Sequence, residues 1–494
     1  MGNLTVGLSV PVHGRRRVAS RDLVTSILTL VGSEWFALFS LLLIVAGGLL
    51  FRLSAVVVGD MDEGTYVYAG KLLSEGKLPY RDFLIAHPPL LIVLLAGWEW
   101  LAGPDLMWVR IAYMVTILAS TVPLYVTTRT LTRSEMAGLF SVAVYISGLV
   151  LLGNMGRTVK LEPLTNAFLI AAIACYLLRP DSVRVRFLIG VLLGLAALVK
   201  LVAVVPAVLL VLADLLWPRP ERRFLRSWFV AAGGALLVLG PAAMLLLGQP
   251  NFINDVVLSH LGRPGMTLDF RLSQLVARVF VRYPVIPLAL IAAIWLLVRG
   301  RDARVRSLAI ITLGSTIALV FAFKTFYGYY FVQVLPWIAV VFGVVVCGHT
   351  RQVTQRWAST LLFVGALALG GVVPTVYGEV YHRTAAAHVS SPARIVSLLK
   401  GGEGYVYSMY PSFALWSGRE LYPWYYTVDS LIPRITGRAG DDDFRRVFAE
   451  CQALVLWPGE LAEYPDALSY VERHFTVAYE DAHYTLWVRS VADG

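Results

Sequence analysis

The sequence has 494 residues, of which 57% are hydrophobic and 15% are charged. Soluble globular proteins average about 45–50% apolar and about 25% charged residues, so this composition excludes that class and predicts a polytopic α-helical membrane protein. The net charge of +10 does not indicate a nucleic-acid partner, because residues 1–377 hold 32 Lys and Arg against 17 Asp and Glu, whereas residues 378–494 hold 10 against 15. A basic excess confined to the membrane part is typical of cytoplasmic loops beside anionic membrane lipids.

The N-terminal segment carries Arg15, Arg16, Arg17 and Arg21 before the first apolar stretch. That stretch, at about 23 residues, is longer than a signal-peptide core of about 7–15. We therefore expect residues 1–34 to be a cytoplasmic segment before an uncleaved first helix. The three cysteines, Cys175, Cys347 and Cys451, offer neither a disulfide framework nor a CxxC metal site.

Eleven apolar stretches could cross a hydrocarbon core of about 30 Å, with allowance for short or broken helices. They are Trp35–Val58, Leu106–Thr128, Met136–Leu152, Leu164–Leu178, Phe187–Val199, Leu201–Trp217, Trp228–Leu247, Val285–Val298, Leu308–Phe323, Tyr330–Cys347 and Trp357–Tyr377. The fifth and sixth form one apolar run with basic flanks, so a turn at Lys200 is expected to return the chain. Residues 35–377 are expected to form one membrane domain.

Pro88–Leu101 also resembles a span, but counting it would place the later basic loops outside. We expect an amphipathic helix in the outer interface instead, with Trp98 and Trp100 at headgroup level. Residues 378–494 then lie outside. Short alternating or β-rich runs at Gly404–Ser408, Ala453–Trp457 and His474–Val488, and a helix-compatible stretch at Asp441–Cys451, predict a small extracytoplasmic α/β domain.

The first outer loop, residues 59–105, holds Asp60, Asp62 and Glu63 directly after the first span. Ionisable groups at a membrane boundary are costly to desolvate, so they indicate a functional site. Glu63–Glu75 is expected to form a helix stopped by Gly76, with Asp62 or Asp60 as its N-cap. Capping accounts for one carboxylate of three, and a carboxylate that faces outside could accept a proton from a hydroxyl.

Further along the same loop, Arg81 and Asp82 either pair with each other or face a ligand, and their spacing does not decide between the two. His87-Pro88-Pro89 fixes the chain direction, because proline favours the first helical turn and restricts the residue before it.

A second charged site follows in residues 154–166, with Arg157, Lys160 and Glu162. Glu162-Pro163 fits either a helix start or a charged functional site. Lys200 and Lys324 stand at the outer ends of apolar runs, where a lysine can extend to the headgroups or bind a ligand. Together with Arg263 and His260, and beside the aromatic run 324–331, these cations could hold a phosphate at a weakly solvated site.

In order and approximate spacing, these motifs resemble the GT-C glycosyltransferases, in particular the branch of dolichyl-phosphate-mannose protein mannosyltransferases and aminoarabinose and galacturonic acid transferases. The matching motifs are Asp62-Glu63 with Tyr66 and Ala69, His87-Pro88-Pro89-Leu90, Glu162-Pro163, Gly194–Lys200, His260 with Arg263, Lys324 to Pro336, and Ser417-Gly418-Arg419. The sequence departs from this pattern at one point. The aminoarabinose transferases have a glutamate directly before a Lys-Pro pair. Here the corresponding pair is His87-Pro88, and the residue before it is Ala86.

The resemblance implies a multi-pass enzyme of the cell membrane. It would transfer a sugar from a polyprenyl-phosphate donor to an extracytoplasmic lipid, glycan or protein acceptor, with inversion at the anomeric carbon. The catalytic candidates are Asp62 as base, then Asp60, Glu63 and Glu162. The donor-phosphate candidates are Lys200, Arg263, Lys324, Tyr327, Tyr330 and Arg157. The acceptor or substrate candidates are Tyr66, Asp82, His87 and His260. No cofactor is assigned, and a divalent cation is one option whose ligands stay unassigned.

The main alternative is a transporter or lipid flippase, which would place charges in the middle of spans. Here the acids gather at the outer ends of spans, which favours interfacial chemistry. The sugar, the acceptor, the polyprenol and the oligomeric state are left open by the sequence.

Overall fold

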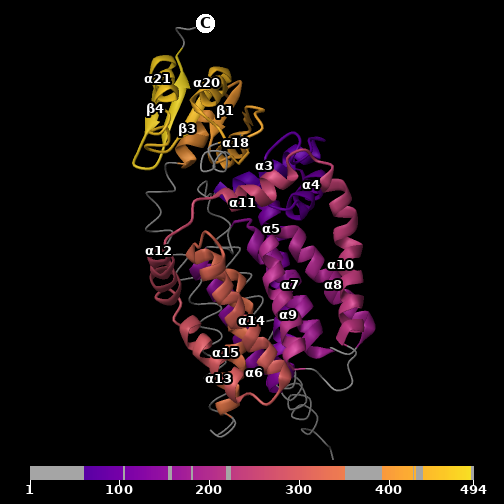
Figure 1. Ribbon diagram of the computed structural model, residues 1–494. Coiled ribbons are helices and arrows are strands. Elements are labelled where there is room, and N and C mark those ends of the chain that lie inside the picture. The colour runs from indigo at the N-terminus through magenta and orange to yellow at the C-terminus, as the bar shows by residue number, and fades with distance from the viewer. Residues whose placement is uncertain are drawn as a thin grey trace, which may run out of the picture.

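The computed structural model describes residues 61–103, 106–153, 158–179, 182–217, 224–350, 392–426, 428–429 and 438–490. The expected spans Trp35–Val58 and Trp357–Tyr377, and the expected domain boundary at 377/378, lie outside these ranges. Figure 1 shows a long bundle of helices with a small sheet and its helices beyond one end. We call that end of the bundle the sheet end.

The bundle helices follow the apolar runs, because a chain in hydrocarbon must satisfy its own backbone hydrogen bonds. They are α5 (Leu106–Thr132), α6 (Glu135–Gly153), α7 (Leu161–Leu178), α8 (Val183–Val199), α9 (Val204–Leu216), α10 (Phe224–Leu247), α13 (Val285–Arg299), α14 (Ala303–Ile317) and α15 (Leu335–Thr350). Within the described residues, four helices are long and apolar enough to cross a membrane, or five if the bent pair Leu268–Phe280 and Val285–Arg299 is one span. The multi-span character is confirmed, and the count of eleven stays a prediction.

The apolar run 187–217 is interrupted where the sequence predicted. Helix α8 ends at Val199, Lys200 is extended with φ −153° and ψ 125°, and a short 3-10 turn, η1 (Leu201–Ala203), leads into α9. The extended backbone turns the Lys200 side chain away from both helices toward the sheet end, where a charged group can reach polar partners.

Close packing of α8 against α10 depends on two glycines. A Cβ on Gly190 would lie 1.8 Å from the carbonyl oxygen of Ala231, and one on Gly234 would lie 2.1 Å from that of Phe187. Small residues let helix backbones approach in this way where lipid offers no hydrophobic force between helices. Any side chain at either position would push the two helices apart.

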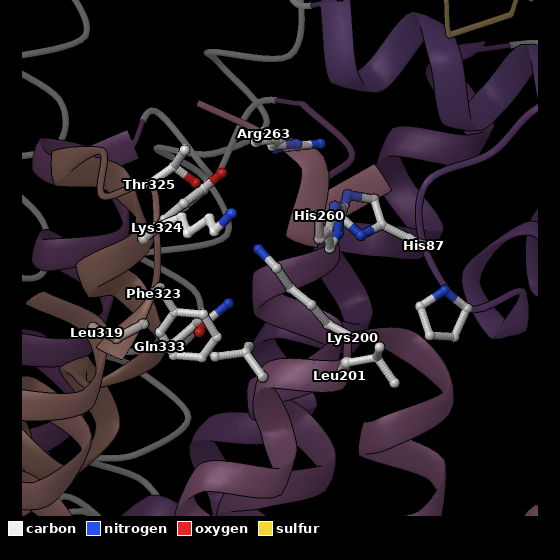
Figure 2. Close-up of a pocket in the computed structure, with 13 residues that line it drawn as sticks. His87, Lys200, Leu201, His260, Arg263, Leu319, Phe323, Lys324, Thr325 and Gln333 are labelled. Carbon is white, nitrogen blue, oxygen red and sulfur yellow. The ribbon is translucent and has the colours of Figure 1, made fainter. Parts of the chain in front are cut away.

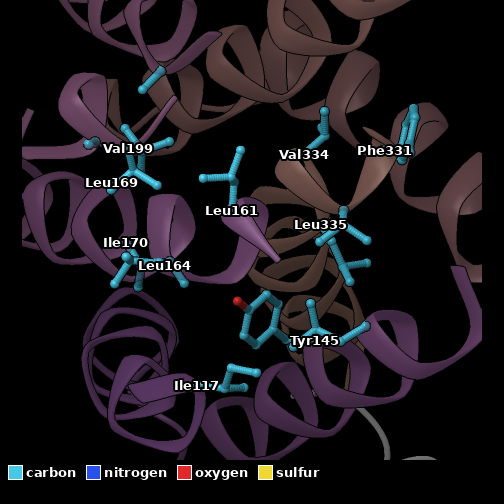
Figure 3. Packing of buried hydrophobic residues seen from close by; sticks show 14 of the residues in the cluster. Ile117, Tyr145, Leu161, Leu164, Leu169, Ile170, Val199, Phe331, Val334 and Leu335 are labelled. Atoms are coloured by element: carbon cyan, nitrogen blue, oxygen red, sulfur yellow. The ribbon is translucent and has the colours of Figure 1, made fainter. Parts of the chain in front are cut away.

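The core of the bundle forms around α7. Figure 3 shows its buried side chains facing those of neighbouring helices. The residues in this contact include Leu161, Leu164, Leu169 and Ile170 of α7, Ile117 of α5, Tyr145 of α6 and Leu335 of α15. The amide of Asn166 donates a hydrogen bond of 2.9 Å to the carbonyl of Val332 in the 3-10 helix η5 (Gly328–Gln333). The start of α7 and the aromatic run are thereby held together.

The short helices α3 (Met61–Ser74), α4 (Leu90–Ala102) and α11 (Ser259–Gly262) lie at the sheet end of the bundle, whereas α12 (Leu268–Ser273) lies along its side (Figure 1). The other short elements are η2 (Asn254–Leu258), η3 (Gln274–Phe280) and η4 (Ala318–Ala322). Helix α3 matches the expected helix, and Gly76, with φ +87°, follows its end. Of the two expected N-caps, Asp62 lies within the first turn of α3. Asp60, the other candidate, lies outside the described residues. Helix α4 buries Leu91 and Leu95 and leaves Trp100 exposed.

The C-terminal sheet has the strand order β2-β1-β3-β5-β4. The strands are β1 (Tyr405–Ser408), β2 (Glu420–Leu421), β3 (Cys451–Leu456), β4 (Phe475–Glu480) and β5 (Thr485–Arg489). Strand β1 is parallel to β2 and β3, whereas β5 is antiparallel to β3 and β4. Helices α18 (Ser412–Ser417), α20 (Asp441–Glu450) and α21 (Pro465–His474) accompany the sheet. The expected strands and the helix at 441–451 are confirmed, and the run 474–488 is a hairpin.

Candidate functional site

Two adjoining cavities lie at the sheet end of the bundle. The larger has a volume of about 490 Å³ and the smaller about 130 Å³. They share part of their lining: His87, Lys200, Arg263, Thr325 and Tyr330. A ligand in one cavity therefore lies beside a ligand in the other.

The smaller cavity combines cations with an apolar wall. Figure 2 shows the side chains of Lys200, Lys324 and Arg263 around it, with Leu319 and Phe323 on one side. The ammonium of Lys324 donates to the carbonyl of Leu261. The Nε of Arg263 is buried and has no hydrogen-bond partner among the described residues. Such a site suits an anion attached to an apolar chain, because charged hydrogen bonds gain strength where water is scarce.

Two histidines stand side by side in the wall of the smaller cavity. The ring centroids of His87 and His260 are 5.3 Å apart, and both rings appear together in Figure 2. Burial and the nearby charges of Arg263 and Lys200 lower the pKa of His260 to about 3. Burial, followed by His260, Lys200 and Arg263, lowers the pKa of His87 well below its usual value. Both imidazoles are therefore neutral at physiological pH and can each donate one hydrogen bond.

The larger cavity is lined by carboxylates and phenols. The carboxylates belong to Asp62, Glu162 and Asp429. The phenols belong to Tyr66, Tyr327, Tyr329 and Tyr330. Burial and the charges of the three carboxylates raise the pKa of Tyr66 well above its usual value, so its phenol remains a hydrogen-bond donor.

Two of these carboxylates are paired with lysines. The ammonium of Lys160 lies 3.2 Å from Asp62, and that of Lys200 lies 2.6 Å from Glu162. The Lys200 ammonium also lies 4.7 Å from the ring centroid of Tyr330, within the range of cation–π attraction. Lys200 thus connects the cations of the smaller cavity with the carboxylates of the larger one.

Glu63 differs from its neighbour because it is buried within an ion pair. The guanidinium of Arg110 contacts it through two nitrogens, at 2.9 and 2.5 Å, and both side chains are 1% exposed. The backbone N–H of Val159 also donates to Glu63 at 3.0 Å. Glu63 therefore joins α3, α5 and the segment before α7, and it does not line either cavity.

The structure brings most of the sequence-predicted site residues together. The larger cavity contains Asp62, Glu162, Tyr66, His87, Lys200, Arg263, Tyr327 and Tyr330, and the smaller one adds His260 and Lys324. Asp82 pairs with Arg81 at 2.8 Å in an exposed turn and lines a separate cavity of about 80 Å³. Of the two interpretations for this pair, mutual pairing is therefore the one observed. Asp60 and Arg157 lie outside the described residues.

Two residues that line the larger cavity, Tyr329 and Asp429, were missed as candidates. Tyr329 carried a signal, since it lies in the predicted aromatic run. Asp429 carried none, because only the tertiary fold brings the C-terminal region to the first loop. Lys160 was expected in the charged site beside Glu162 but was given no role. Among the described residues, no group of three or more His, Cys, Asp or Glu side chains is placed to hold a metal ion.

No family model and no curated protein matches this sequence. Solved structures match its fold. The crystal structure of ArnT from Cupriavidus metallidurans bound to undecaprenyl phosphate has a TM-score of 0.65 at 14% identity, with 93% of this chain and 99% of that chain covered. The oligosaccharyltransferase of Archaeoglobus fulgidus in the apo form has a TM-score of 0.54 at 13% identity, with 93% and 75% covered.

The Archaeoglobus fulgidus oligosaccharyltransferase AglB in complex with an inhibitory peptide and a dolichol-phosphate matches with a TM-score of 0.51 at 10% identity, covering 93% of this chain and 74% of that chain. The Archaeoglobus fulgidus oligosaccharyltransferase in complex with Zn and sulfate has a TM-score of 0.52 at 13% identity, with 92% of this chain and 73% of that chain covered. At these identities the likeness establishes a shared fold, the GT-C fold of membrane glycosyltransferases. The fold expected from the sequence motifs is confirmed.

Proposed function

We propose that this chain is an inverting glycosyltransferase of the cell membrane that moves a sugar from a polyprenyl-phosphate donor to an extracytoplasmic acceptor. One observation carries the proposal: a cavity with cations and apolar walls adjoins a cavity with carboxylates and phenols, and Lys200 lines both. The likeness to ArnT bound to undecaprenyl phosphate supports a lipid phosphate as the donor group.

The donor phosphate would lie in the smaller cavity, beside Lys200, Arg263 and Lys324, with its lipid along the apolar wall. The sugar would extend into the larger cavity. There an acceptor hydroxyl would give its proton to Asp62, and its oxygen would attack the anomeric carbon from the side opposite the phosphate. As the new C–O bond forms, the bond from the anomeric carbon to the phosphate oxygen breaks, and its electron pair stays with the lipid phosphate.

The lysine and arginine side chains stabilise the negative charge that develops on the departing phosphate. Such electrostatic stabilisation of the transition state is usually the largest single contribution to catalysis by a preorganised site. The neutral imidazoles of His87 and His260 add hydrogen-bond donors without adding charge. Glu162, held by Lys200, orients the acceptor, and Glu63 orients α3 through Arg110.

Among the described residues, the side chains of the two cavities do not fit a divalent cation. The described residues contain no three-ligand group, and the carboxylates of Asp62 and Glu162 are each next to a lysine ammonium, which opposes binding of a further cation.

The deciding experiment incubates the purified protein in detergent with a panel of polyprenyl-phosphate sugars and identifies the lipid phosphate released. Release from at least one donor, lost in Asp62→Asn, is the expected result. Movement of the intact donor between the two leaflets of liposomes, without release of lipid phosphate from any donor, would overturn the proposal in favour of a transporter or flippase.

A further inference from the structure

One carboxylate of the larger cavity comes from the part of the chain after residue 391, which we call the C-terminal unit. Asp429 is half-buried and lines the cavity together with Asp62 and Glu162. The three carboxylates act on the same phenol, since each contributes to the raised pKa of Tyr66. Asp429 therefore lies within electrostatic reach of the position where we place the acceptor.

The backbone before Asp429 is fixed against the bundle. Val428 is 3% exposed and belongs to the core of the helical part. Its carbonyl accepts a hydrogen bond of 3.1 Å from the hydroxyl of Thr65 in α3. One turn of that helix separates Thr65 from Asp62, so the same helix positions the proposed base and this contact.

A second set of contacts holds the same segment at Tyr425. Its carbonyl accepts from the backbone N–H of Leu84 at 2.8 Å, and its hydroxyl donates to the buried carboxylate of Asp255. Arg438 contacts the other oxygen of Asp255 at 3.1 Å. Because these contacts are buried or half-buried, the placement of Asp429 is part of the fold.

The lining of the larger cavity fits a molecule with several hydroxyls. Carboxylates accept hydrogen bonds from hydroxyls, phenols donate and accept, and tyrosine rings offer flat apolar faces to the C–H face of a sugar. A serine or threonine acceptor presents one hydroxyl, which Asp62 alone can engage. A further carboxylate on the side of the C-terminal unit is useful when the acceptor presents a second hydroxyl.

We propose that the acceptor is a glycan, and that Asp429 positions it by accepting a hydrogen bond from a hydroxyl other than the one that gives its proton to Asp62. This inference rests on the proposed transferase function and names its acceptor class. The acceptor sugar lies between the bundle and the C-terminal unit, so both parts of the chain contribute to one site.

The test compares the full-length wild type, Asp429→Asn and Asp442→Asn. Asp442 is a matched control because it belongs to the same C-terminal unit and its side chain is 85% exposed. A polyprenyl-phosphate sugar that the wild type turns over serves as donor. Methyl glycosides and dodecyl glycosides serve as acceptor probes, which separates free from lipid-anchored sugars, and a short peptide with serine and threonine is the alternative probe.

We expect the wild type to transfer sugar to a glycoside. In Asp429→Asn the acceptor KM should rise about 10-fold or more, the loss typical of one hydrogen bond to a charged group. Donor KM and slow hydrolysis of the donor by water should stay within about 2-fold, because neither uses the second hydroxyl. The control variant should match the wild type in every measurement.

Transfer to the peptide but not to a glycoside, or to neither, would overturn the inference, as would an unchanged acceptor KM in Asp429→Asn. A fall in donor hydrolysis equal to the fall in transfer would show a structural role for Asp429 and would also overturn it. These results differ from failure of the proposed function, in which the wild type releases no lipid phosphate from any donor.

Discussion

Asp62 and Glu63 are adjacent in the sequence, yet Asp62 faces the larger cavity while Glu63 is buried against Arg110. Successive residues of a helix differ by about 100° around its axis, so one carboxylate of the pair points to the cavity and the other to the bundle. The two acids of one motif therefore have different physical roles: Glu63 fixes the helix that presents Asp62.

We expect Glu63→Gln to destabilise the protein. The substitution removes the negative charge that faces the buried guanidinium of Arg110, and breaking a buried ion pair in this way costs about 3–5 kcal/mol. Thermal unfolding of purified protein in detergent should show a clearly lower midpoint, with a reduced yield from membranes. Asp62→Asn is the matched control and should unfold like the wild type. Normal stability with lost turnover in Glu63→Gln would instead make Glu63 a catalytic candidate.

We expect each of the three cations of the smaller cavity to contribute to donor binding. Replacing Lys200 or Arg263 with alanine removes a charged group from a partly buried site, which costs roughly 1.5–3 kcal/mol. Replacing Lys324 should cost less, because this lysine is exposed and solvent screens its charge. Donor affinity, measured with a polyprenyl-phosphate sugar, should fall accordingly. Lys400→Ala, at an exposed lysine of the C-terminal unit, is the control. Unchanged donor affinity and turnover in Lys324→Ala would identify that lysine as a simple membrane anchor.

Much of the fold was predictable because its signals are local. The break at Lys200 follows from one long apolar run with basic flanks. The β-rich run 474–488 predicted strand, although not the pairing of β4 and β5 as a hairpin. Helix lengths were less predictable, because the π-helical segment η4 and the 3-10 helix η5 replace α-helix at one end of the expected spans Leu308–Phe323 and Tyr330–Cys347. Those interruptions depend on packing partners that the local sequence does not reveal.

The candidate site was predictable where one element carries its own signal. Acids at the ends of apolar runs indicated Asp62 and Glu162, and cations at the same depth indicated Lys200. The pairing of Glu63 with Arg110 was not predictable, since Arg110 lies within an apolar helix and only packing of α3 on α5 makes it a partner. The same reason applies to Asp429, which the fold of the C-terminal unit carries to the cavity.

We expect stability to fall in mild acid because of the two histidines. The pKa of His260 is lowered to about 3, and that of His87 is well below its usual value. Between about pH 6.5 and pH 3 an unfolded chain binds a proton at position 260 and the folded chain does not, and His87 acts in the same direction. Stability is therefore complete above about pH 6.5 and decreases as the pH falls, by roughly 1 kcal/mol or less per pH unit for each half-buried histidine.

The measurement is the unfolding midpoint from pH 7 to pH 5. The variant His260→Gln should show a shallower pH dependence than the wild type, because its side chain does not titrate there. His474→Gln serves as the control, since His474 belongs to the last turn of α21, far along the chain from the cavities. Parallel pH profiles for the wild type and His260→Gln would contradict this account.

We expect the amino terminus to be cytoplasmic and the C-terminal unit to be outside, as the asymmetry of charged residues predicts. In a variant without native cysteines, a cysteine placed at 460–470 should react with an impermeant maleimide in intact cells. A cysteine placed at 219–223 should react only after the membrane is opened. The reverse pattern would place both cavities on the cytoplasmic face and would exclude an extracytoplasmic acceptor.

The last prediction concerns Asp62 as the base. A hydroxyl is a weak nucleophile until its proton is removed, and general-base assistance is typically worth about 10²–10⁴-fold in rate. Asp62→Asn keeps the size of the side chain and can still contact Lys160, but it removes the proton acceptor. We therefore expect normal insertion, near-normal donor affinity and a transfer rate lower by about 10²-fold or more.

The variant Lys160→Met distinguishes the role of the base, Asp62, from the role of the lysine that contacts it. If Lys160 only holds the Asp62 carboxylate in place at 3.2 Å, this variant should lose less activity than Asp62→Asn. Asp60→Asn is the necessary companion, because Asp60 lies two residues before Asp62 in the same loop. Activity retained in Asp62→Asn but abolished in Asp60→Asn would move the base by two residues. Activity retained in both variants would contradict a transfer mechanism that depends on a carboxylate of this loop.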